Sequence, residues 1–142
     1  MTAPYSYSVS LRIWHPRMDP AALTTALRLT PSNSWKVGEQ RRTRKGEPLK
    51  GKNRGSYWTA RLITTRYATT TRKSLEASLA TIAKKLQRHR KLLLRIRRGG
   101  GKAELFVGLF GRNKFNFGSG LDDRTVTDLS KLRLSVGLDI YP

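Results

Sequence analysis

The stretch from Ser74 to Gly101 reads SLEASLATIAKKLQRHRKLLLRIRRGGG, and the other predicted elements can be arranged around it. Its apolar residues recur at alternating spacings of four and three, interrupted once at His89: Leu75, Leu79, Ile82, Leu86, Leu93 and Ile96. At about 100° per residue these positions form one narrow stripe along a helix. Gly99, Gly100 and Gly101 follow the last periodic residues and predict the end of that helix. The stretch therefore predicts a long helix that packs one side on a protein core.

Five cations follow the same spacing on the opposite side of this predicted helix: Lys84, Arg88, Lys91, Arg95 and Arg98. A solvated charged face usually mixes both signs, because like charges at this spacing repel one another. No acidic residue occurs between the first and the last of the five. Cations about 5–6 Å apart suit a phosphate backbone, so the row predicts a polyanionic partner.

A second reading of the end of this stretch stays open. Leu92, Leu94 and Ile96 also alternate with charged residues, which is the pattern of a strand. A helix that ended near His89 and a strand after it would split the basic row. The continuous helical spacing favours a single helix.

Composition limits the classes of function. The chain has 142 residues, enough for one domain with a real core, and carries a formal charge of +20 from 29 Lys and Arg against 9 Asp and Glu. Such an excess repels itself unless an anion neutralises it, and nucleic acid is the commonest such partner. Neither a lipidation motif nor an amphipathic terminal anchor is evident, so no membrane partner is expected.

The residue types that are missing narrow the chemistry further. The chain has no cysteine, which excludes disulfides, thiolate catalysis and cysteine metal sites. No apolar run reaches transmembrane length, and the first ten residues lack the pattern of a signal peptide. We therefore expect a cytoplasmic protein.

Alternation and capping signals place the remaining elements. Period-two alternation predicts strands over residues 5–14, 56–67, 102–110 and 132–141. Short helices are expected over 21–29, with Asp19 as the cap, and from Asp122 or Asp123 through Leu132. A threonine among residues 69–71 is expected to cap the long helix. The order predicts an α+β two-layer sandwich, in which a single, mostly antiparallel sheet of about four to five strands carries its helices on one face.

A second basic segment lies between the first helix and the second long strand. Residues 36–55 predict a long, flexible basic loop with four glycines and only two acids. A solvated linker is the ordinary explanation, but eight like charges favour ordering on a nucleic acid. The eight cations are Lys36, Arg41, Arg42, Arg44, Lys45, Lys50, Lys52 and Arg54.

Aromatic residues could add base stacking. Phe115 and Phe117 are the best candidates because they lie in a basic, glycine-rich segment. Aromatics on the predicted strands are more often core residues: Trp14, Trp35, Tyr57 and Trp58.

No catalytic or metal-binding group is expected. His15 stands just before a proline at a strand end, where capping a turn is the natural role, and His89 falls on the apolar side of the long helix. The acids are scattered, whereas acid–base and two-metal chemistry need convergent carboxylates. No phosphate-binding loop or nucleophile elbow is present. We therefore expect no cofactor, no metal and no enzyme activity.

Several segments together resemble a known family. They are residues 7–42 (YSVSLRIWHPRMDPAALTTALRLTPSNSWKVGEQRR), Ser56–Trp58, Ala103–Phe110 and the closing Leu138–Tyr141. They are similar to an uncharacterised bacterial family that is known only as domain of unknown function 4279, over nearly the whole chain. The resemblance implies a compact, ferredoxin-like α+β fold and implies no activity. The density of arginine departs from what the family leads one to expect, which indicates a basic function added to a common scaffold.

The sequence thus favours a non-catalytic nucleic-acid-binding protein, free or within a ribonucleoprotein, that contacts phosphates through the basic helix and the basic loop. RNA is slightly favoured over DNA, since no helix-turn-helix or other major-groove module is found. The alternative is a protein-interaction module, such as an immunity-type inhibitor or an assembly factor, that docks on an acidic partner. A phosphate-ester enzyme is a third and weaker alternative.

Overall fold

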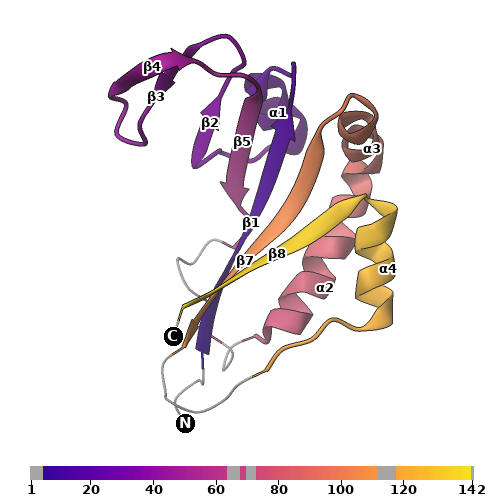
Figure 1. The fold of residues 1–142 in the computed structure, drawn as a ribbon. Helices are drawn as coiled ribbons and strands as arrows, with labels where there is room; N and C mark the ends of the chain where they lie inside the picture. Colours follow the sequence, from indigo (N-terminus) through magenta and orange to yellow (C-terminus); the bar gives the residue numbers. More distant parts are fainter. Residues whose placement is uncertain (1–4, 64–67, 70–72, 112–117, 142) are drawn as a thin grey trace.

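The computed structural model describes residues 5–63, 68–69, 73–111 and 118–141 (Figure 1). Its main sheet has the strand order β2-β5-β1-β7-β8, with β6 paired to β1 beside β5, and all neighbours run antiparallel except β7 and β8. The predicted α+β class and largely antiparallel sheet are confirmed. The strand order does not establish the ferredoxin-like arrangement. The strands of the sheet are β1 (Tyr5–His15), β2 (Asn33–Trp35), β5 (Ser56–Arg61), β6 (Ala68–Thr69), β7 (Lys102–Gly111) and β8 (Leu134–Tyr141).

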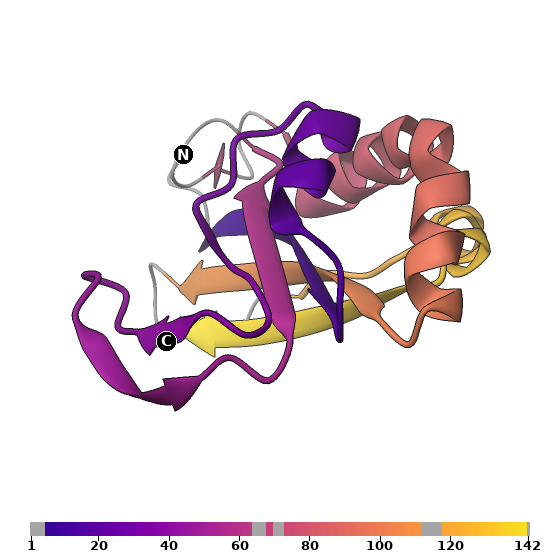
Figure 2. The same ribbon diagram turned by 90° about the horizontal axis from the view of Figure 1, so that it is seen from above.

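The sheet has one covered and one open face (Figure 2). Alternation along β1 decides which side chains face the helices, because successive residues point to opposite faces. Tyr7, Val9, Leu11 and Ile13 are buried with apolar residues of the helices. The residues between them are Ser, Arg and Trp, are half-buried, and face away from the helices. The predicted faces of this strand are confirmed.

The first helix begins where its sequence indicates but ends before the predicted Leu29. α1 (Pro20–Leu27) starts at Asp19, whose Oδ1 accepts a hydrogen bond from Ala21 N at 3.0 Å. It ends at Arg28, which has a left-handed backbone (φ 54°). Leu23 and Leu27 are buried on the sheet, and the predicted cap is confirmed.

The predicted single long helix is wrong. The segment forms α2 (Leu75–Leu86), a short 3-10 turn η1 (Gln87–His89) and α3 (Arg90–Arg98). The chain changes direction at the turn, where Gln87 Nε2 donates both to Ala83 O (3.1 Å) and to Asp128 O (3.0 Å). At the break, Gln87 is thus hydrogen-bonded to the helix that contains Asp128, which is distant in sequence. The alternative strand after His89 is also wrong.

The start of α2 also differs from the prediction. Ser74 is the cap, and its Oγ accepts from Ala77 N at 3.1 Å. Thr69 instead lies in β6, and residues 70 and 71 lie outside the described residues.

Glycines end α3, as predicted. Gly101 N donates to Ile96 O at 2.9 Å, and Gly100 has a φ of +89°, which together form a Schellman-type cap. A Cβ on Gly101 would lie 2.6 Å from Trp14 O and 2.8 Å from His15 Cδ2. This close approach lets α3 pass directly into β7 beside the end of β1.

The last helix and strand follow the prediction with one exception. α4 (Asp123–Lys131) is capped by Asp122, whose Oδ1 accepts from Thr125 N at 2.8 Å, while Leu129 and Leu132 are buried. The spacing of Val126, Leu129 and Leu132 predicts one buried side of the helix, but Val126 is 49% exposed. Thr125, the residue before it, is buried in its place.

The basic segment is a hairpin rather than the predicted loop. β3 (Gln40–Arg42) and β4 (Pro48–Lys52) pair antiparallel in a separate two-stranded sheet. At the tip, Thr43 N donates to Glu47 O (2.8 Å) and Gly46 N to Thr43 O (2.9 Å), while Gly46 takes a φ of +90°. Gly46, one of the four glycines that predicted irregular structure, serves this turn. Figure 2 shows the hairpin on the opposite side of the sheet from the helices.

His15 is predicted to make stability depend on pH. Its Nδ1 accepts from Arg17 N and Met18 N, both at 3.0 Å, which confirms the predicted turn cap and requires a neutral ring. Burial, and secondarily repulsion from Arg17, lowers the pKa of His15 below its ordinary value. The unfolded chain therefore takes up a proton more readily, so stability is full above the unfolded pKa of about 6.5 and declines as the pH falls below it.

The measurement is the melting temperature between about pH 7.5 and about pH 5.5, a range that spans the ordinary histidine pKa. His15→Asn keeps a side-chain acceptor but does not titrate, so it should lose less stability over this range. A residual loss should remain, since burial also lowers the pKa of His89. A melting temperature that rises on acidification would contradict the assignment.

Candidate nucleic-acid interface

The open face of the sheet and the hairpin together form a hollow of about 1040 Å³. We call it the sheet–hairpin groove. Its floor comes from alternate residues of β1, β5 and β7, and its wall comes from the hairpin. The lining includes Ser8, Ser10, Arg12, Asn33, Trp35, Gln40, Arg42, Arg44, Asn53, Tyr57, Thr59, Arg61, Phe106 and Phe110.

Hydrogen bonds at its base hold the hairpin over the sheet. Asn53 N donates to Glu39 O (2.8 Å) and Asn53 Nδ2 donates to Lys36 O (3.0 Å). Ser56 is buried at the start of β5, where its Oγ accepts from Val37 N (3.0 Å) and donates to Met18 O (2.6 Å). These bonds fix where the hairpin leaves the sheet.

Aromatic rings and cations interleave on the floor. The guanidinium carbon of Arg12 lies 3.5 Å from the ring centroid of Phe106, which is a cation–π contact. At the β2 edge the rings of Trp35 and Tyr57 stack with centroids 4.4 Å apart. Both arrangements leave polar and aromatic surface together on a face that no helix covers.

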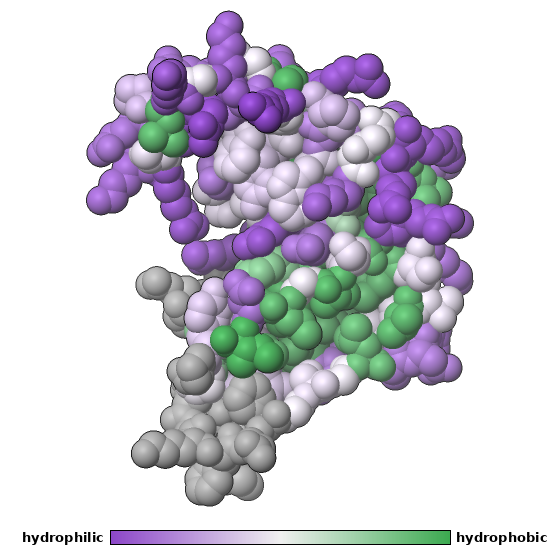
Figure 3. Space-filling view, viewed as in Figure 1, coloured by the Kyte–Doolittle hydropathy of each residue, from purple (hydrophilic) through white to green (hydrophobic). Residues whose placement is uncertain are grey.

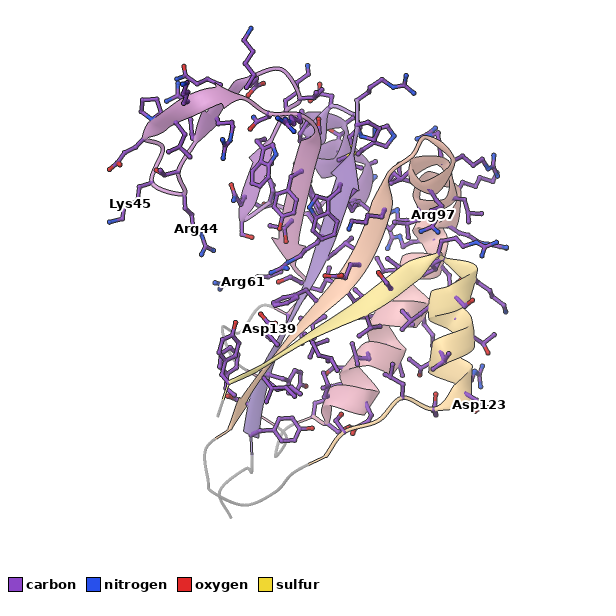
Figure 4. All side chains as sticks on the ribbon, in the orientation of Figure 1. Arg44, Lys45, Arg61, Arg97, Asp123 and Asp139 are labelled. Atoms are coloured by element: carbon purple, nitrogen blue, oxygen red, sulfur yellow. The ribbon has the colours of Figure 1, made fainter. Side chains whose placement is uncertain are left out.

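Cations also face one another across the groove. Arg44 extends from the hairpin tip toward Arg61 of β5 (Figure 4). Arg42 Nη1 donates to Gly46 O at 3.1 Å, which holds this side chain along the hairpin. Glu39 is the one acid among the lining residues. Four guanidinium groups around one hollow with one carboxylate form a site that favours an anion.

At its other end the groove meets the edge strand β8. Phe110 stacks on Tyr141 with centroids 4.9 Å apart and ring planes 6° from parallel. Tyr141 Oη donates to Asp139 Oδ2 at 3.2 Å, and this bond is the main reason that the pKa of Tyr141 is raised. The phenol therefore stays neutral and the stack extends the aromatic surface to the sheet edge.

The hairpin cations predicted as binding residues divide into two groups. Arg42 and Arg44 line the groove. The others are exposed on the outer side of the hairpin or beside it: Lys36, Arg41, Lys45, Lys50, Lys52 and Arg54. Figure 3 shows the surface of the hairpin as mostly hydrophilic.

The predicted helix row is exposed but is not brought to the groove. Lys84 lies on α2, Arg88 in the 3-10 turn, and Lys91, Arg95 and Arg98 on α3. The row is split at the turn and lies on the helical side of the sheet, whereas the hairpin lies on the open side (Figure 2). The two basic elements of the sequence therefore do not form one surface. Phe115 and Phe117 lie outside the described residues.

The sequence-based prediction did not identify most of the residues that form the floor of the sheet–hairpin groove. Arg12 and Arg61 sit singly on strands. Trp35 and Tyr57 line the groove, although strand aromatics were expected more often in the core, and Phe106 and Phe110 were not among the stacking candidates. One signal was available: β7 is apolar on both faces, although helices are predicted on one face only.

No group of three or more His, Asp or Glu side chains that could hold a metal ion occurs within the described residues. Glu76 is engaged elsewhere, since its Oε1 accepts from Ser119 Oγ (2.8 Å) and Gly120 N (3.2 Å), and hydrogen bonding lowers its pKa. Across the same part of the chain, no helix is long and apolar enough to cross a membrane.

These features define an α+β protein whose main sheet is covered by helices on one face and overhung by a basic hairpin on the other. A family model described as "Domain of unknown function (DUF4279)" matches residues 5–142. The chain therefore belongs to this family, as the resemblance predicted. No curated protein and no solved structure matches the chain.

Proposed function

We propose that this protein is a non-catalytic nucleic-acid-binding protein, free or within a ribonucleoprotein, that receives single-stranded RNA in the sheet–hairpin groove. The observation that carries the proposal is the meeting of Arg12, Arg42, Arg44 and Arg61 with exposed aromatic rings in one groove. Arginines neutralise phosphates, and aromatic faces on an uncovered sheet stack on unpaired bases.

The polar floor supports RNA over DNA. Ser8, Ser10 and Thr59 present hydroxyls to the groove, and Asn33 and Asn53 present amides. Such groups can pair with ribose 2′-hydroxyls and with the edges of splayed bases. A duplex offers no free base faces to the aromatic rings, so it should bind only through its backbone.

Salt dependence tests this proposal. Affinity for a short single-stranded RNA should fall steeply between about 50 mM and about 200 mM salt, with a log–log slope of about 0.7 for each phosphate contacted. An RNA hairpin duplex of equal charge should bind more weakly at the higher salt, because stacking persists when phosphate contacts are screened. An affinity that hardly changes with salt would exclude the phosphate contacts. Equal binding of both RNAs would exclude stacking.

A specific observation favours the second candidate, a protein-interaction module. β8 is an edge strand on which Leu138 is 57% and Ile140 65% exposed, and the surface there forms an apolar patch (Figure 3). Edge strands can pair with a partner strand. A purified protein with a high 260/280 absorbance ratio that falls after nuclease treatment favours nucleic acid. A normal ratio with a co-purifying acidic protein favours this alternative.

A further inference from the structure

We propose that the cleft between α3 and α4 is a second nucleic-acid site that grips phosphates only, and that the protein thereby bridges two nucleic-acid segments. We call this hollow, of about 880 Å³, the α3–α4 cleft. Five cations line it, and its lining includes no acid: Arg90, Arg97, Arg98, Lys131 and Arg133. Of these five cations, only Arg98 belongs to the basic row predicted from the sequence.

The break in the long helix builds this cleft. The 3-10 turn redirects α3, and Gln87 Nε2 holds α4 through Asp128 O at 3.0 Å. α3 then presents Arg90 and Arg97, two turns apart, to the side of α4 that carries Thr127 and Ser130. The hydroxyls add neutral hydrogen-bonding groups for phosphate oxygens.

Local stability explains only some of these cations. Basic residues near a helix C-terminus are favoured by the helix dipole, which accounts for Arg98 and Lys131. Arg90 is the first residue of α3, where a cation opposes the dipole. Arg133 has a φ of 56°, a left-handed backbone conformation that residues other than Gly and Asn rarely adopt. Arg90 and Arg133 therefore stand at positions that local structure does not favour for them, which fits a site for an anion.

The contents of the cleft set its ligand class. Leu94 and Val126 are its apolar residues, and no aromatic side chain lines it, so bases have nothing to stack on. Closely spaced cations and hydroxyls without aromatic rings suit a phosphodiester backbone irrespective of sequence. Asp128 of α4 is not among the lining residues, and the acids Asp122 and Asp123 lie at the opposite end of this helix.

The two sites face in different directions. The groove lies on the open face of the sheet, and the cleft lies among the helices on the other face (Figures 1 and 2). Figure 4 shows Arg44 and Arg61 on one side of the strands and Arg97 on the other. A short strand held in the groove therefore leaves the cleft free for a second segment. The inference that the protein bridges two segments rests on the proposed binding of single-stranded RNA in the groove.

Bridging is tested by capture. A biotinylated oligo(U) is immobilised, the full-length protein is added, and a fluorescent oligo(U) of the same length is offered as the second strand. Wild type should retain the fluorescent strand. Arg90→Glu/Lys131→Glu should lower retention about tenfold or more, because two phosphate-binding cations are reversed, while binding of the first strand changes little. Arg17→Glu/Arg28→Glu, the charge-matched control, should retain the strand as wild type does, because these exposed cations line neither site.

Three results would overturn bridging: no capture by wild type, full capture by the cleft variant, or capture complexes whose mass contains two protein copies. Light scattering measures that mass. Circular dichroism checks folding, and Arg97→Gln/Arg133→Gly provides a second cleft variant that also suits the left-handed backbone at residue 133. If the first strand itself fails to bind wild type, the groove proposal fails, and this outcome is distinct from a loss of bridging alone.

Discussion

Charge reversal by Arg42→Glu/Arg61→Glu is expected to lower the affinity for single-stranded RNA about a hundredfold or more. Arg42 belongs to the hairpin wall and Arg61 to the sheet floor, so the double variant disrupts both sides of the groove. A charged hydrogen bond contributes about 1.5–3 kcal/mol, and about 1.4 kcal/mol corresponds to a tenfold change in the dissociation constant. The salt slope should also fall by about 1.4, since two single-strand phosphate contacts are lost.

The chain offers a matched control in the row that the sequence singled out. Arg88→Glu/Arg95→Glu produces the same change in charge with exposed side chains on the helical side of the sheet. We expect a small loss of affinity that disappears at higher salt, because only long-range attraction is reduced. Titration by fluorescence anisotropy at two salt concentrations measures both variants. A larger loss in the helix variant than in the groove variant would move the single-strand site to the helices.

Trp58→Ala is expected to destabilise the fold by about 3–5 kcal/mol, because it leaves a large cavity in the core. Trp58 is fully buried, and its indole Nε1 donates to Thr24 Oγ1 of α1 at 3.0 Å. The substitution therefore removes both the packing of β5 on α1 and a hydrogen bond between them. Such a loss is a large part of the stability of a domain of this size.

Tyr57→Ala is the natural comparison, because Tyr57 stands next to Trp58 on β5 but points to the open face of the sheet. Tyr57 is half-buried in the groove and contacts Trp35 and Trp14. We expect a much smaller stability change and a weaker affinity for single-stranded RNA. Urea unfolding measures the first effect and RNA titration the second. Equal destabilisation by the two substitutions would mean that the open face is also part of the core.

Much of the fold was predictable because local patterns carry it. Alternation assigned Tyr57 and Trp58 to opposite faces, Asp19 marked a helix start, and Gly99–Gly101 marked a helix end. These signals depend on backbone periodicity and on caps formed within a few residues, so the sequence contains them directly. Family membership was likewise visible from residues spread along the chain.

The candidate site was less predictable because it is assembled from distant segments. Arg12 meets Phe106 only through the pairing of β1 with β7, which aligns Arg12 with Glu104 and Ser10 with Phe106. No local pattern marks a single arginine on a strand as part of a site. The run of glycines and cations in residues 36–55 was read as a loop, since hairpin pairing with an irregular register leaves little periodicity.

The sequence by itself determined that the protein is basic, α+β, and built on strands with one apolar face, because composition and two-residue alternation are local properties. Only the tertiary structure decided what the stretch from Ser74 to Gly101 becomes. The helical spacing resumes after its one interruption at His89 and so favours a continuous helix, whereas the structure has a break there, accompanied by a hydrogen bond from Gln87 to Asp128 O, 41 residues away. The uniform basic row is therefore divided, and the concentrated charge lies instead in the sheet–hairpin groove and the α3–α4 cleft, where segments distant in sequence meet.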